Sequence, residues 1–174
     1  TIESFNGKCF AWEADLSTTS NIPILFDKAE KHFGKVDILV NNAAFCKGDT
    51  FIPDELTEDF LGELPVATIS DDSHNDHFAV NSRAVALLIK EYAKRYIDRK
   101  GGYGRIINIS TDGASGHCHC VSYGASKLAM ESFSRAAAGE LGPYGISVNV
   151  LSLGAVQTGW LPPEIAKQIA QTYP

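Results

Sequence analysis

Short apolar runs alternate with longer segments of helical periodicity along this chain. Four runs have the apolar, β-branched or aromatic composition of strands, at residues 8–12, 36–40, 105–109 and 146–151. Residues 36–40 and 105–109 are apolar almost throughout, which is typical of strands covered on both faces of a sheet. The pattern therefore predicts buried strands rather than a half-exposed sheet.

Apolar residues recur at intervals of four between these strands. Pro23 suits the first turn of a helix that continues to Phe33. Ser70 is a candidate N-cap for a long second helix, which ends before the glycines that follow residue 100. A third helix is predicted over residues 123–141 because it is bounded by a glycine–proline pair.

Strand and helix alternate in this order along the chain, which implies a parallel sheet with helices on both faces. The chain of 174 residues has the length of one ordinary domain. We therefore expect the α/β class and a single domain over residues 1–174. Residues 45–69 depart from the pattern, as an acidic excursion with two prolines that is irregular or partly helical.

Composition and charge narrow the range of partners. Hydrophobic residues make up 44% and charged residues 21%, as in ordinary globular domains. The net charge of −6, without a basic run, argues against nucleic acid or an anionic membrane surface. No apolar run approaches the roughly 20 residues that span a bilayer, and the start does not resemble a signal peptide. Because Cys118 and Cys120 are poorly placed for a disulfide, a reducing, cytoplasmic setting is expected.

The sharpest chemical signal is Tyr123-Gly-Ala-Ser-Lys127, at the start of the third predicted helix. A spacing of four places both side chains on one helix face. A free tyrosine has a pKa of about 10, and an adjacent ammonium group would lower the pKa of Tyr123 toward neutrality. The same spacing occurs often by chance, so its meaning depends on the surrounding motifs.

The asparagine pair in Asn41-Asn-Ala-Ala44 follows the strand at 36–40, and a lone Asn81 lies in the long helix. Two strand segments begin with glycine or proline: Gly104-Arg-Ile-Ile-Asn-Ile-Ser110 and Pro143-Tyr-Gly-Ile-Ser-Val-Asn149. The tyrosine and lysine lie between them, in Ser122-Tyr-Gly-Ala-Ser-Lys127. In their order along the chain, and over nearly all of it, these motifs resemble the short-chain dehydrogenase/reductase family. The branch most similar is the one with β-ketoacyl-carrier-protein reductases and sugar or steroid dehydrogenases.

The resemblance implies a catalytic set of Asn81, a hydroxyl residue, Tyr123 and Lys127. Tyr123 would exchange the proton at the substrate oxygen, Lys127 would lower its pKa and hold the nicotinamide ribose, and Asn81 would anchor a water in a proton relay. The hydroxyl that orients the carbonyl falls on Thr111 by strand register and on Ser110 by the distance to the tyrosine. Strand register favours Thr111, and both residues stay candidates.

Cofactor contacts carry over in the same way. The resemblance assigns dinucleotide binding to residues in four segments: Asp15, Leu16, Asn41, Asn42, Ala43, Ala44, Tyr123, Lys127, Gly154, Val156 and Thr158. Asp15 and Leu16 would meet the adenine, the segment 42–44 the ribose, and the segment 154–158 the carboxamide. The implied cofactor is NADP or NAD, since the segment that selects between them is not in the chain.

The family's glycine-rich turn, its first two strands and its last strand have no counterpart here. The expected fold is therefore an incomplete Rossmann-like, doubly wound parallel sheet. Two absent strands would separate residues 8–12 from residues 36–40 by roughly 14 Å. The longer working protein would then supply the missing pieces; in a rearranged sheet, residues 8–12 would instead pair directly with residues 36–40.

Two further features have weaker interpretations. His117-Cys-His-Cys120 could suggest a metal site, but adjacent ligands rarely close a tetrahedral site without a second pair, so no metal is expected and the segment is interpreted as a loop beside the substrate pocket. The excursion at 45–69 is either a flap that shapes the substrate pocket or a neutral insertion.

The sequence as a whole predicts an oxidoreductase that transfers a hydride between NAD(P) and a small carbonyl or alcohol, with a 3-oxoacyl substrate as one option. The alternative is a dinucleotide-binding sensor or scaffold of the same fold without turnover. No nucleic acid and no membrane partner is expected. The resemblance also implies a homo-oligomer, a tetramer, in which the long helix and the alanine-rich third helix pack against their symmetry mates.

Overall fold

The structure is a computed structural model that describes residues 2–53, 65–154, 156, 163 and 167. Its helices are α1 (Asn21–Phe33), α2 (Asp71–Phe78), α3 (Val85–Asp98) and α4 (Val121–Leu141), with a π-helical segment η3 (Ala79–Ala84) and 3-10 turns η1 (Glu3–Phe5), η4 (Asp112–Ser115) and η5 (Gly142–Tyr144). Its strands are β1 (Ile38–Asn41), β2 (Gly48–Thr50), β3 (Val66–Thr68), β4 (Gly104–Thr111) and β5 (Ile146–Leu153).

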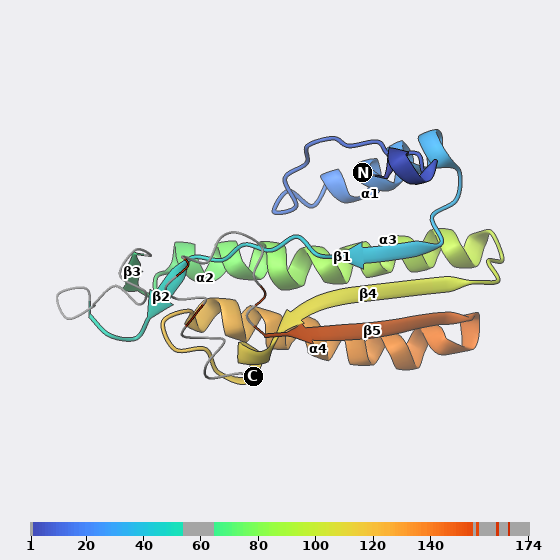
Figure 1. The fold of residues 1–174 in the computed structure, drawn as a ribbon. Coiled ribbons are helices and arrows are strands. Elements are labelled where there is room, and N and C mark those ends of the chain that lie inside the picture. Colours follow the sequence, from blue (N-terminus) through green and yellow to red (C-terminus); the bar gives the residue numbers. More distant parts are fainter. Residues whose placement is uncertain (1, 54–64, 155, 157–162, 164–166, 168–174) are drawn as a thin grey trace.

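Three parallel strands form the main sheet, in the order β1-β4-β5. Leu39 pairs with Ile106, and the β4–β5 ladder runs without a break from Gly104 to Thr111. Figure 1 shows the three strands side by side and pointing the same way. The expected α/β fold with a parallel sheet is confirmed, and the carboxyl ends of the strands meet at one edge.

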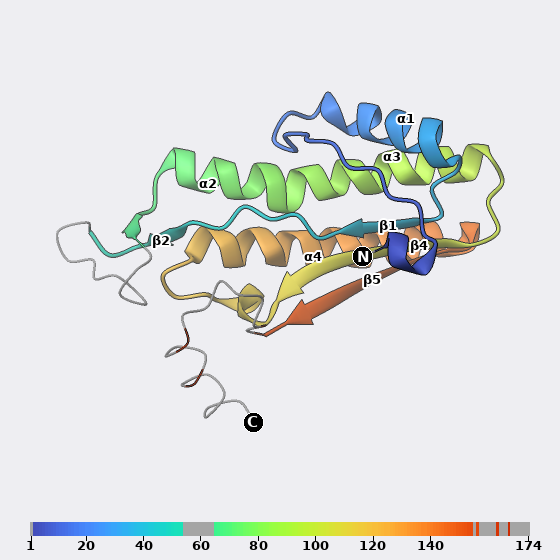
Figure 2. The same cartoon turned by 45° about the horizontal axis from the view of Figure 1, so that its top comes forward.

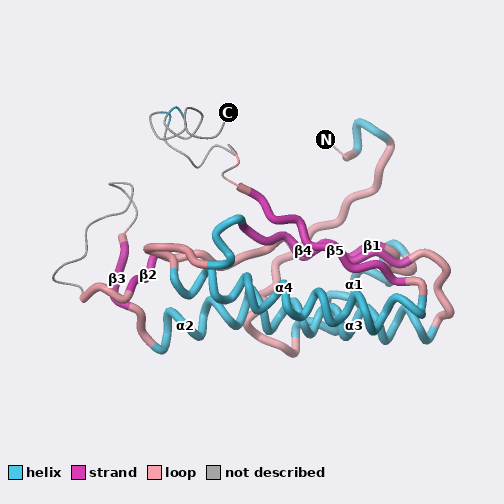
Figure 3. Tube along the Cα trace, turned by 90° about the horizontal axis from the view of Figure 1, so that it is seen from below, coloured by secondary structure: helices cyan, strands magenta, loops and turns pink. Residues whose placement is uncertain are grey.

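One face of this sheet is covered by α3 and α4, which lie along it in Figures 2 and 3. The core between the helices and the sheet contains Tyr92, Tyr96, Ile106, Met130 and Ile146, each exposed by 1% or less. The Tyr92 hydroxyl donates to the Asp37 carbonyl at 2.5 Å and accepts from the Arg105 amide at 3.2 Å. Packing and a buried hydrogen-bond bridge therefore fix the helix α3 to the amino end of the sheet.

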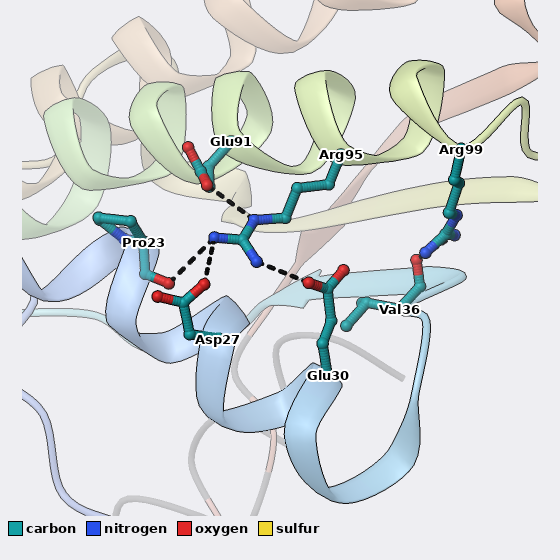
Figure 4. Close-up of polar contacts among 7 residues, drawn as sticks. All are labelled: Pro23, Asp27, Glu30, Val36, Glu91, Arg95 and Arg99. Carbon is teal, nitrogen blue, oxygen red and sulfur yellow. Dashed lines mark hydrogen bonds and ion pairs between the residues drawn. The ribbon is translucent and has the colours of Figure 1, made fainter.

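Helix α1 is joined to α3 through the guanidinium of Arg95, as Figure 4 shows. Arg95 donates to Glu30 at 2.6 Å, to Asp27 at 2.7 Å and, within its own helix, to Glu91 at 2.7 Å. Burial lowers the pKa of Arg95, but its hydrogen bonds to Glu91, Asp27 and Glu30 outweigh burial and raise the pKa overall. The single cation therefore neutralises three carboxylates at this helix contact.

Residues 8–12 do not form a strand, so that prediction is wrong. In the described part of the chain they have no ladder partner, and Phe10 stacks on His32 of α1 with ring centroids 3.8 Å apart. An apolar run becomes a strand only where a neighbouring strand accepts its hydrogen bonds, and none lies beside this one. Direct pairing of residues 8–12 with β1, the rearranged alternative, is excluded.

The excursion at 45–69 contains a parallel pair, β2 with β3, which the sequence did not predict. Residues 54–64 between them lie outside the described residues. The long helix is also divided, because α2 passes through the π-helical η3 into α3. Among the described residues, no helix has the length and apolar character needed to cross a lipid bilayer.

Candidate active site

Most of the predicted site residues lie at the carboxyl edge of the main sheet. Asn42, Ala43 and Ala44 follow β1, Thr111 ends β4, and Gly154 follows β5. In open parallel sheets this edge is where ligands bind, because loops from neighbouring strands diverge there. The fold therefore brings together segments that are more than a hundred residues apart in the sequence.

Tyr123 and Lys127 lie one turn apart near the start of α4, as the spacing predicted. The Lys127 ammonium is 5.7 Å from the centroid of the Tyr123 ring and donates to the carbonyl of Ile109, on β4, at 2.8 Å. Lys127 is 3% exposed, and Tyr123 is half-buried. The lysine thus links the tyrosine helix to the strand that ends in the candidate hydroxyl residues.

The pKa of Tyr123 is raised, chiefly by burial and further by the nearby thiols of Cys46 and Cys120. Burial also lowers the pKa of Lys127, with Cys46 opposing that change. The direction is therefore opposite to the one expected from Lys127, whose charge is not among the causes of the shift. The physical reason is that the ammonium lies over the ring and binds a carbonyl, while the phenol is partly removed from water.

Asn81 is fully buried in the π-helical segment between α2 and α3. Its carboxamide oxygen accepts from the Phe45 amide at 2.8 Å, and its nitrogen donates to the Phe45 carbonyl at 2.8 Å and to the Ser126 hydroxyl at 3.0 Å. The side chain therefore joins the segment after β1 to the helix α4. A π-turn inside an α-helix is frequent at functional sites.

The two candidate hydroxyl residues have different environments. The Ser110 hydroxyl donates to the Glu131 carboxylate at 2.7 Å, and Ser110 is 4% exposed. Thr111 is half-buried, and its hydroxyl makes only 3.3 Å contacts, with the side chain of Asp112 and the amide of Gly113. Ser110 is committed to a structural contact, whereas the Thr111 hydroxyl is nearer to being available.

The predicted cofactor residues gather on the α1 side. A cavity of about 280 Å³ is lined by Leu16, Asn41, Asn42 and Ala43 together with apolar residues of α1 and α3. Asp15 lies beside it, exposed, and hydrogen bonds from Ser17 lower the pKa of its carboxyl group. Apolar side chains lining a cavity suit an apolar ring, and an exposed carboxylate nearby can accept hydrogen bonds from a ligand.

The other cofactor candidates have different surroundings. Asn41 is buried and donates to the Asn108 side chain at 2.7 Å, so it holds β1 against β4. Ala44, Gly154 and Val156 are exposed and therefore open to a ligand. Thr158 lies outside the described residues.

Three residues near Tyr123 were not singled out from the sequence as active-site residues: Cys46, Asp49 in the short strand β2, and His77, which lies one turn before Asn81. The ring of His77 is 6.4 Å from the Tyr123 ring. The ring of His117, in the segment interpreted as a loop beside the substrate pocket, is 6.2 Å from it. For His77, the available signal was its four-residue spacing from Asn81.

The two thiols have opposite properties. A hydrogen bond from Cys120 and the charge of Lys127 lower the pKa of Cys46 against the effect of burial. The pKa of Cys120 is raised by its hydrogen bond with Cys46 and by burial. Among the residues described, no group of three or more His, Cys, Asp or Glu side chains could hold a metal ion.

A family model described as short chain dehydrogenase matches residues 1–168. The chain belongs to the short-chain dehydrogenase family. Relatives include the uncharacterized oxidoreductase YjdA of Bacillus subtilis (strain 168), 29% identical over 96% of this chain and 61% of its own. Another is the 3-oxoacyl-[acyl-carrier-protein] reductase FabG of Buchnera aphidicola, 31% identical over 83% of this chain and 53% of its own.

Solved structures agree with this family fold. An NAD⁺-bound xylitol dehydrogenase superimposes with a TM-score of 0.73 at 24% identity, over 91% of this chain and 55% of its own. A metagenomic short-chain oxidoreductase in complex with NADP gives a TM-score of 0.71 at 26% identity, over 98% of this chain and 70% of its own. The chain thus spans 61% of the length of the Bacillus subtilis relative and 53% of the length of the Buchnera aphidicola relative.

Proposed function

We propose that this family member transfers a hydride between NAD(P) and a carbonyl or alcohol, with Tyr123 as the proton donor or acceptor. The observation that carries the proposal is the position of Tyr123 and Lys127, one turn apart on α4 and tied to the end of β4. Asn81 joins the same helix to the segment after β1. The proton-transfer groups thereby meet at the edge where the family binds its ligands.

The raised pKa of Tyr123 keeps its phenol protonated at neutral pH, so it can donate to an oxygen that gains electrons. The Thr111 hydroxyl would orient the carbonyl, since the Ser110 hydroxyl is held by Glu131. Lys127 would add positive charge behind the phenol and hold a ribose hydroxyl. These roles favour the direction of carbonyl reduction.

The described residues suit a dinucleotide on the α1 side. Leu16, Asn42 and Ala43 line the cavity there, and the apolar Leu16 and small Ala43 would permit close approach of an adenosine. The exposed Asp15 would accept from the adenine edge. When bound, the nicotinamide supplies or accepts the hydride, and the exposed segment at Gly154 and Val156 would contact its carboxamide.

The substrate class proposed is a ketoacyl thioester or a comparably small ketone. A similar protein of Buchnera aphidicola is named 3-oxoacyl-[acyl-carrier-protein] reductase, and one of Dickeya dadantii is named 2-dehydro-3-deoxy-D-gluconate 5-dehydrogenase. The test is oxidation of NADH and of NADPH by the full-length protein with acetoacetyl thioesters, keto sugars and cyclic ketones. Tyr123→Phe should lower kcat by about 100-fold or more.

Binding of NADPH without turnover of any carbonyl would instead support the sensor alternative. Turnover that Tyr123→Phe leaves unchanged would remove the tyrosine from the mechanism. Phe is the matched replacement, because it retains the ring and its contacts with His77 and His117 and removes only the hydroxyl.

We also propose a cytoplasmic homotetramer. Leu128 and Phe133, on α4, are 42% and 46% exposed, which supports a further contact for this helix. All four cysteines are free thiols, in keeping with a reducing compartment. Light scattering of the full-length protein should give four times the protomer mass, and Phe133→Glu should reduce it; a monomer would contradict the proposal.

A further inference from the structure

Asp49, in the short strand β2, is 1% exposed and connects three segments. One carboxylate oxygen accepts from the backbone amide of Ser122 at 2.9 Å, and the other accepts from the Ser73 hydroxyl at 2.9 Å. Its own amide donates to the carbonyl of His119 at 3.1 Å. Strand β2 is therefore fastened to α2 and to the start of α4 at Asp49.

The start of α4 has no cap from its own sequence. Cys120 occupies the cap position with φ −144° and ψ 51°, and its side chain makes no capping hydrogen bond. The first amides of any helix lack partners within the helix, and a carboxylate is a favourable acceptor for them. Asp49 provides this acceptor to Ser122, the second residue of α4, from 73 residues away.

The other end of the Asp49 segment is fixed to the helix that carries Asn81. Asn81 binds both the amide and the carbonyl of Phe45. The Lys47 amide donates to Nε2 of the fully buried His77 at 3.2 Å, which places the ring proton on Nδ1, against the Ser73 carbonyl. Residues 45–49 thus connect the helical segment that carries Asn81 to the first turn of α4.

Ser122 directly precedes Tyr123, so a shift of the Ser122 amide moves the tyrosine. We propose that Asp49 is a positioning residue for Tyr123: its carboxylate caps α4 from the excursion and sets the distance between the tyrosine and the Asn81 helix. This inference rests on the proposed function for its kinetic consequence. On this account residues 45–49 belong to the framework of the active site.

The ionisation of Asp49 agrees with this role. Burial raises the pKa of its carboxyl group, but contacts with Ser122 and with Ser73 outweigh burial and lower the pKa overall. The carboxylate is therefore charged at neutral pH, which strengthens its hydrogen bond to the helix amide.

The test compares Asp49→Ala, Asp49→Asn and a matched control, Asp37→Asn, in the full-length protein. The Asp37 carboxylate likewise accepts a hydrogen bond, from the Arg99 side chain at 3.0 Å, but Asp37 precedes β1 at the opposite end of the sheet. The activity probe is NADPH or NADH oxidation with ethyl acetoacetate. A second readout, independent of activity, is the amide hydrogen exchange of Ser122 by NMR.

Asp49→Ala should speed Ser122 exchange by about five- to tenfold, the factor that loss of an N-cap implies. It should lower kcat by roughly 100-fold, with the KM for the ketoester changed by less than about threefold, because geometry rather than binding is lost. Asp49→Asn retains an acceptor oxygen and should recover most of kcat while its Ser122 exchange stays about twofold to threefold faster than wild type. Asp37→Asn should match wild type in both.

Unchanged Ser122 exchange in Asp49→Ala would overturn the inference whatever the kinetics. Faster exchange with an unchanged kcat would also overturn it, provided that Tyr123→Phe is inactive. If wild type reduces no carbonyl, the proposed function fails and Ser122 exchange alone decides whether Asp49 positions the helix. If Asp49→Ala does not fold, Asp49→Asn decides by the same exchange measurement.

Discussion

The two faces of the main sheet differ in how far their side chains are exposed. On the face covered by α3 and α4, Ile106, Asn108 and Ser110 of β4 are exposed by 0–4% (Figure 3). On the other face Ile38 and Val40 of β1 are exposed by 51% and 52%, and Leu151 of β5 by 47%. Strand β4 therefore has one face inside the core, while the strands on either side of it expose apolar residues on the other face.

The proposed chemistry divides in the same way. Asn81, Tyr123 and Lys127 are carried by helices on the covered face and are joined by internal hydrogen bonds. The dinucleotide candidates Asp15, Asn42 and Gly154 are exposed. The relative positions of the proposed proton-transfer residues are therefore fixed by hydrogen bonds within the fold. The proposed dinucleotide-binding residues are instead exposed and can contact a ligand.

The largest expected effect is the loss of kcat on removal of the Thr111 hydroxyl, at the end of β4. Thr111→Val removes a hydroxyl proposed to orient the carbonyl and should lower kcat by about 100-fold. Ser110→Ala breaks a contact with Glu131 inside the covered face and should cost about 1 kcal/mol of unfolding free energy, with kcat lowered less than about threefold. Steady-state kinetics and urea unfolding of both variants separate the roles; the reverse ranking of kcat would assign the substrate contact to Ser110.

A stability effect of about 2 kcal/mol is expected for Arg95→Met, measured by urea unfolding. The guanidinium is 21% exposed and holds Asp27 and Glu30 of α1 against α3, so its loss leaves carboxylates close together. The matched control is Arg135→Met. Arg135 pairs with Glu131 at 3.3 Å, and its side chain is 64% exposed. Its replacement should lower the free energy of unfolding by less than about 0.5 kcal/mol. Equal losses would show that the α1 contact is no stronger than a surface pair.

The titration of Tyr123 gives a third test. Because burial raises its pKa, its tyrosinate absorbance, taken as wild type minus Tyr123→Phe, should appear only above the usual tyrosine value of about 10. Reduction that uses the phenol as donor should then stay constant through neutral pH and fall only as the phenol ionises. Tyrosinate already present near pH 8 would mean that Lys127 dominates over burial.

The smallest effect concerns the thiols beside the tyrosine. Cys46 is exposed and its pKa is lowered by the hydrogen bond from Cys120 and by Lys127, while the pKa of Cys120 is raised. Iodoacetamide should therefore alkylate Cys46 about tenfold faster than Cys120, by peptide mass spectrometry. Lys127→Met should slow the Cys46 reaction, and equal rates at both thiols would contradict the assigned ionisation.

The sequence was informative where one element contains the whole signal. The strands β1, β4 and β5 and the helix α4 were predicted because their periodicity is local, and the Tyr123–Lys127 pair because both residues share a helix. The strand expected at residues 8–12 was wrong because strand formation depends on a partner that no local pattern reports. The pair β2–β3 was missed for the same reason, since three-residue strands leave almost no periodicity.

By itself, the sequence determined the α/β class, the family and the residues that could exchange a proton, since these follow from local pattern and motif order. Only the tertiary structure separated Ser110 from Thr111, by giving Ser110 a partner in Glu131. It also reversed the expected pKa direction of Tyr123, because desolvation depends on which distant segments cover the ring. Asp49 became visible only there as well, since a cap that crosses 73 residues is a property of packing and leaves no local trace in the chain.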